Sequence, residues 1–148
     1  MPSNEMQLKN DLQSRNFAPV YFFYGEEHYL IRHYLSRFVQ KVVTDNPEFN
    51  LDEFDSGVSV QQIYDSAMAF PLMSERKCAS VCDLKLNELP QAEFKELVSL
   101  VSDPNPTTVL IFCFETVDIP QKKMPDRFVK LIAAIEKGGG RAVRFEHK

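Results

Sequence analysis

The chain has 148 residues, of which 44% are hydrophobic and 26% charged, and its net charge is −4. This composition is typical of one globular domain, and the sequence has no apolar run of the ~20 residues that a membrane span needs. The polar N-terminus excludes a signal peptide, so we expect a cytoplasmic protein, and the acidic balance disfavours strong binding of the chain alone to DNA or RNA.

Helices and strands are predicted to alternate along the chain. Apolar residues at three- and four-residue spacing predict helices at residues 5–15, 27–43, 60–69, 90–102 and 121–137. Apolar runs predict strands at residues 20–24, 49–54, 77–81, 107–114 and 142–145, with Phe49 and Phe54 in the core. Ser59 and Gln62 have the spacing of a capping box at the start of the third helix. Such alternation predicts a parallel sheet covered on both faces, and the continuous apolar runs of the first and fourth strands predict that both are buried inside it.

The first strand runs through a single glycine, Gly25, into a helix, which is the frame in which nucleotide-binding folds hold phosphate. A working phosphate loop also needs a lysine for the phosphates and a serine or threonine for Mg²⁺. This chain has Glu26 and Glu27 there, and these place negative charge where the helix dipole would attract an anion. Two adjacent carboxylates in one helical turn do not converge on a substrate atom, so an acid–base pair is disfavoured. We interpret the three residues as a degenerate phosphate-loop position.

Cys78, Cys82 and Cys113 all lie in apolar, strand-like segments and form no CxxC motif. Free core thiols are therefore favoured over a metal or redox site. The three histidines have no metal-ligand spacing, so the sequence predicts neither a metal site nor a cofactor.

The predicted third helix ends in apolar residues where glycine and polar residues are usual. These residues are Phe70, Pro71, Leu72 and Met73. Exposed large apolar residues in a loop often mark a partner site. The alternative is that Leu72 or Met73 turns inward and packs under the next strand, and the sequence leaves both open.

Several blocks along the chain resemble the N-terminal domain of the delta subunits of bacterial DNA polymerase III, in the clamp-loader clade of AAA+ proteins. They are residues 20–31, 50–57, 69–77 and 107–112, followed by a lysine-rich helix with a glycine turn. The resemblance implies a three-layer α/β/α fold with a five-stranded, predominantly parallel sheet in the order 5-1-4-3-2, in which the first and fourth strands are adjacent at the centre. It also implies that residues 1–148 form a single AAA+-like domain, with the family's lid and collar domains absent from this chain.

By the same resemblance, we expect a non-catalytic domain that binds the ring-shaped sliding clamp (the beta subunit) and helps to open it. The hydrophobic pair with which the family contacts the clamp falls on Leu72 and Met73, beside Phe70 and Pro71. Other clamp-loader subunits would bind through the missing C-terminal domains, and primed DNA only as part of the complex. The alternative is a nucleotide- or nucleotide-sugar-binding α/β enzyme domain with an irregular phosphate loop. The absence of Lys, Ser and Thr directly after Gly25 argues against that alternative.

Overall fold

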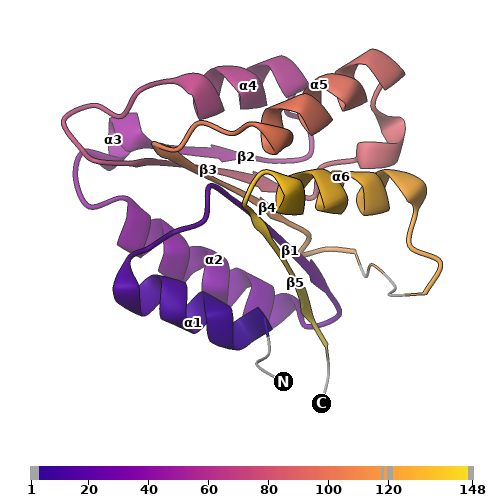
Figure 1. The fold of residues 1–148 in the computed structure, drawn as a ribbon, viewed down its shortest axis with the longest axis horizontal. Helices are drawn as coiled ribbons and strands as arrows, with labels where there is room; N and C mark the ends of the chain where they lie inside the picture. Colours follow the sequence, from indigo (N-terminus) through magenta and orange to yellow (C-terminus); the bar gives the residue numbers. More distant parts are fainter. Residues whose placement is uncertain (1–3, 118, 120–121, 147–148) are drawn as a thin grey trace.

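Five strands form one sheet with a layer of helices on each face, in a computed structural model that describes residues 4–117, 119 and 122–146 (Figure 1). The strands are β1 (Val20–Gly25), β2 (Leu51–Phe54), β3 (Lys77–Cys82), β4 (Thr108–Cys113) and β5 (Arg141–Phe145). The helices are α1 (Asn4–Ser14), α2 (His28–Val42), α3 (Pro47–Asn50), α4 (Val60–Met68), α5 (Gln91–Ser102) and α6 (Asp126–Lys137), with a short 3₁₀ turn, η1, at Leu86–Glu88.

The strand order is β2-β3-β4-β1-β5, and every neighbouring pair is parallel. This is the predicted AAA+-like order 5-1-4-3-2, and β1 and β4 are adjacent inside the sheet as expected. All six residues of β4 are buried, because both faces of this strand are covered.

Two hydrophobic clusters lie on opposite faces of the sheet. Side chains alternate along β1, so that Val20 and Phe22 face α4, α5 and α6 while Tyr21 and Phe23 face α1 and α2. The continuous apolar sequence of β1 thus contributes side chains to both cores. The sheet packed in this way is the rigid frame from which the connecting loops project.

The predicted second strand was wrong at its start. Residues 47–50 form the single helical turn α3, and Phe49 is 59% exposed where we expected a core residue. Pro47 has a backbone angle suited to the first turn of a helix, which explains why the strand begins only at Leu51. Phe54 packs against the core as expected.

The predicted last helix was also too long at its start. Helix α6 begins at Asp126, directly after Pro125. A residue before proline is disfavoured in helical conformation, so Met124 cannot continue a helix through this position. The earlier part of the prediction, residue 121, lies outside the described residues.

The capping box at the start of α4 is confirmed. The Gln62 N–H donates to Ser59 Oγ at 3.1 Å, and the Ser59 N–H donates to Gln62 Oε1 at 2.9 Å. The two bonds satisfy backbone donors that the first helical turn leaves without partners. They fix where α4 begins, and the helix ends at Met68, with Ala69 between it and the apolar residues 70–73.

Candidate functional site

The end of β5 occupies the degenerate phosphate-loop position. Gly25 has a φ angle of +125°, and a Cβ at this residue would lie 2.3 Å from the carbonyl oxygen of Phe145. That same oxygen accepts hydrogen bonds from the N–H groups of Glu26 and Glu27, at 2.8 and 3.1 Å. Backbone amides at this place in a phosphate loop would point at the ligand. Here they bind the neighbouring strand.

The charge of Glu26 is also engaged within the domain. Its carboxylate lies 3.7 Å from the guanidinium of Arg144, a residue of β5. Arg144 in turn pairs with Glu146 and lies over the ring of Tyr24. Glu26 therefore helps to hold the end of β5 against the start of α2, which is a structural role.

The second candidate site is the apolar turn, which we define as Phe70, Pro71, Leu72 and Met73. Phe70 is 84% exposed, Leu72 is 47% exposed and Met73 is 85% exposed, whereas Pro71 is half-buried. The structure thus projects both Leu72 and Met73 into solvent and does not pack them under β3. That they contact a partner stays a prediction.

More apolar surface adjoins the turn on α4. Tyr64 and Met68 are exposed one helical turn apart, and both line an open groove of about 440 Å³ between α4 and α5. Exposed apolar side chains thus occur both on the turn and on the helix that precedes it.

A buried amide holds the apolar turn in place. Asn50 is fully buried, and its Oδ1 accepts the N–H of Leu72 at 2.7 Å. Its Nδ2 donates to the carbonyl oxygens of Leu72 and of Asp45, each at 2.9 Å. Met73 has a φ of +52°, a left-handed conformation that is uncommon outside glycine. The backbone of the turn is therefore fixed from within while its side chains point outward.

Asn50 was not among the predicted site residues. Asn50 is at a polar position of the predicted second strand. The sequence alone does not show that its side chain is buried and bonded to Leu72, 22 residues later. The pattern that could have pointed to it is the helical turn after Pro47, since that turn takes Asn50 out of the strand.

A small polar network lies next to this anchor. Lys77, at the start of β3, is buried and pairs with Asp52 of β2, and Ser66 Oγ of α4 donates to the same carboxylate oxygen at 2.5 Å. Burial raises the pKa of Asp52, but the bonds from Lys77 and Ser66 outweigh it and hold that pKa below its usual value. The network joins β2 and α4, which precede the apolar turn, to β3, which follows it.

None of the described helices is both long enough and apolar enough to cross a bilayer.

Comparisons with known proteins agree with this architecture. A family model for the DNA polymerase III delta subunit matches residues 21–136. The DNA polymerase III subunit delta of Bacillus subtilis (strain 168) is 32% identical, and the match covers 85% of this chain and 37% of the relative.

Two solved structures are similar in fold. The DNA clamp loader delta protein of Bacillus subtilis matches with a TM-score of 0.75 and 28% identity, over 96% of this chain and 42% of that one. A DNA polymerase III gamma subunit-related protein of Thermotoga maritima matches with a TM-score of 0.63 over 96% of this chain and 46% of that one. Its 16% identity supports the fold alone. The chain spans less than half the length of each of these relatives.

Proposed function

This chain belongs to the DNA polymerase III delta subunit family, and we propose that it is the part of a clamp-loader subunit that binds the sliding clamp. The observation that carries the proposal is the apolar turn, whose side chains are exposed while its backbone is fixed by Asn50. Phe70 and Met73 contribute no hydrophobic stabilisation while they face water, whereas a partner with an apolar pocket would bury them.

The expected binding energy suits a reversible contact. Two apolar side chains buried in a pocket contribute on the order of 3–6 kcal/mol before ordering costs. A turn that is already held by Asn50 loses little conformational freedom when it binds, so more of this energy appears as affinity. Since about 6 kcal/mol corresponds to a dissociation constant of about 40 μM, a micromolar anchor also requires contacts of the domain with the clamp beyond these two side chains.

We further propose that binding helps to open the clamp ring. A bound protein can shift the balance between a closed and an open ring only if it binds the open form more tightly. A rigid domain can bind the open ring more tightly than the closed ring, because it does not deform to fit both. The parallel sheet with a hydrophobic core on each face supports such rigidity.

Lack of catalysis is the second half of the proposal. The amides of Glu26 and Glu27 that would cradle a phosphate are bonded to Phe145, which argues against the alternative of a nucleotide- or nucleotide-sugar-binding enzyme. Other clamp-loader subunits would bind the full delta subunit through segments outside this chain. Contact with primed DNA would arise only in that complex, as the net charge of −4 supports.

The test is direct binding of this chain to the sliding clamp of the same organism, measured by calorimetry. We expect saturable binding with a dissociation constant in the micromolar range. Absence of binding at a clamp concentration of about 1 mM would overturn the proposal, because even a weak anchor is occupied there.

A further inference from the structure

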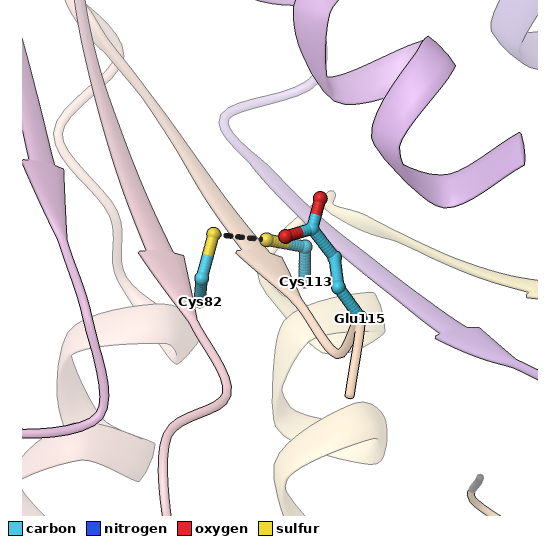
Figure 2. Close-up of side chains that lie close together, drawn as sticks. All are labelled: Cys82, Cys113 and Glu115. Atoms are coloured by element: carbon cyan, nitrogen blue, oxygen red, sulfur yellow. Dashed lines mark hydrogen bonds between the residues drawn. The ribbon is translucent and has the colours of Figure 1, made fainter. Parts of the chain in front are cut away.

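Two cysteine thiols and a carboxylate meet at the carboxyl ends of β3 and β4 (Figure 2). Cys82 ends β3 and Cys113 ends β4, and the two residues are direct partners in the parallel register. Both side chains point to the face covered by α1 and α2. Glu115 lies two residues beyond Cys113, and its carboxylate lies beside the two thiols.

The donor atoms are close together. The sulfur atoms of Cys82 and Cys113 are 2.6 Å apart, and the three donors, including a Glu115 oxygen, lie within 4.8 Å of one another. Cys113 is fully buried and Cys82 is half-buried, so the cluster lies at the rim of the core with one side accessible to solvent.

The backbone around Glu115 is held in position. Asp83 directly follows Cys82, and its Oδ1 accepts the N–H groups of Glu115 and Thr116 at 2.9 and 3.1 Å. Asp83 therefore ties the segment after β4 to the segment after β3. On the outer side, Arg32 of α2 donates to Glu115 Oε1 at 3.4 Å, which leaves the other carboxylate oxygen for a further ligand.

The electrostatics of the cluster favour a cation. The carboxylate of Glu115 lies among the donor atoms, and Asp83 adds a second carboxylate directly after Cys82. Negative charge at this place attracts a divalent ion, and an ion that coordinates a thiol deprotonates it.

We propose that Cys82, Cys113 and Glu115 form a site for one zinc-class divalent cation. Two thiolates and a carboxylate are three of the four ligands of a tetrahedral zinc site, and a water would complete it. In such a site the sulfur atoms lie about 3.8 Å apart, as zinc–sulfur distances of about 2.3 Å require. Cys82 is half-buried, and a rotation of its side chain about χ1 would supply the necessary ~1 Å. Binding releases the two thiol protons to solvent.

Cys78 provides a matched control on the same strand and face. It is buried four residues before Cys82, and burial raises the pKa of its thiol to about 12. It is no member of the cluster, so it serves as a core thiol of the kind that the sequence predicts.

The test uses the whole chain, stripped of metal with a chelator and kept reduced with a phosphine. Cd²⁺ is titrated as the probe, and the thiolate-to-metal charge-transfer absorbance is followed. We expect saturation at one equivalent for the wild type and for Cys78→Ser, and competition by Zn²⁺. Cys82→Ser should abolish the band, and Glu115→Gln should weaken binding about tenfold or more. Zn²⁺ should also raise the melting temperature of the wild type but not of Cys82→Ser.

Three results would overturn the proposal. One is no charge-transfer band with the reduced wild type, and another is an unchanged band in Cys82→Ser. The third is a reduced protein that takes up no metal but loses two hydrogens by mass when it is exposed to oxidised glutathione. That result would make Cys82 and Cys113 a disulfide-forming pair and not a metal site. Far-UV circular dichroism of each variant distinguishes a lost ligand from a lost fold.

Discussion

Asn50 binds Leu72 through both ends of its side-chain amide, in the way that one strand binds another. Its Oδ1 accepts the Leu72 N–H at 2.7 Å and its Nδ2 donates to the Leu72 carbonyl at 2.9 Å. The two residues come from α3 and from the turn after α4, so this pair joins the edge of the sheet to the exposed apolar surface. A fully buried amide thereby determines the backbone position of residues that face solvent.

We predict that Asn50→Ala lowers both stability and clamp affinity. The substitution leaves the backbone N–H and carbonyl of Leu72 without their partner and frees the turn, so the free energy of unfolding should fall by about 1–3 kcal/mol. Urea unfolding and calorimetry with the clamp measure the two effects. Unchanged clamp affinity in a folded Asn50→Ala variant would contradict the role of Asn50 in positioning the turn.

Gly25→Ala should destabilise the domain strongly. The new Cβ would lie 2.3 Å from the Phe145 carbonyl oxygen, in addition to the strain of a positive φ. Gly139→Ala is the matched control, since Gly139 has a φ of +92° with no atom within 4 Å of an added Cβ. The control should lose about 1–2 kcal/mol through backbone strain alone, and Gly25→Ala clearly more. Equal losses in urea unfolding would show that the contact with β5 is unimportant.

ATP with Mg²⁺ should leave the melting temperature unchanged. The amides of Glu26 and Glu27 already donate to Phe145, and the loop carries carboxylates where phosphate needs donors. Differential scanning fluorimetry at millimolar nucleotide checks this, with ADP and GTP alongside. A saturable, Mg²⁺-dependent rise in melting temperature would favour the enzyme alternative.

We predict that the domain loses stability in acid because of the Asp52–Lys77 pair. The pKa of Asp52 is lower in the folded state, so the folded domain binds fewer protons than the unfolded chain in that pH range. The stabilisation is present above the ordinary aspartate pKa of about 3.9 and is lost as the pH falls through the lower folded pKa. Asp52→Asn removes this titration, so its unfolding free energy should fall less steeply with acid than that of the wild type. Identical slopes for the two proteins would contradict the prediction.

Much of the fold could be predicted because the strands are strongly patterned. The apolar runs of β1 and β4 require burial on both faces, and this places them inside a parallel sheet. Ser59 and Gln62 marked the start of α4 through a local hydrogen-bonding pattern. Proline was the source of both errors, since Pro47 placed the first two residues of a predicted strand in α3 and Pro125 shortened α6.

The candidate sites depend on contacts between distant segments, which the sequence does not display. Leu72 and Met73 could be identified as an anomaly but not oriented, because their exposure depends on Asn50. Likewise Cys82 and Cys113 are 31 residues apart, and only the register of β3 with β4 brings their sulfur atoms together.

The central claim is that the apolar turn binds the sliding clamp, and the double substitution Leu72→Ala/Met73→Ala tests it most directly. Tyr29→Ala is the control, because Tyr29 is about as exposed as Met73 but lies at the start of α2, at the carboxyl end of β1.

Calorimetry with the clamp should show an affinity loss of about 30-fold or more for the double variant, which corresponds to ~2 kcal/mol, and no change for Tyr29→Ala. The unfolding free energy of the double variant should change by no more than about 0.5 kcal/mol, since the side chains are exposed. Wild-type clamp affinity in a folded double variant would contradict the account.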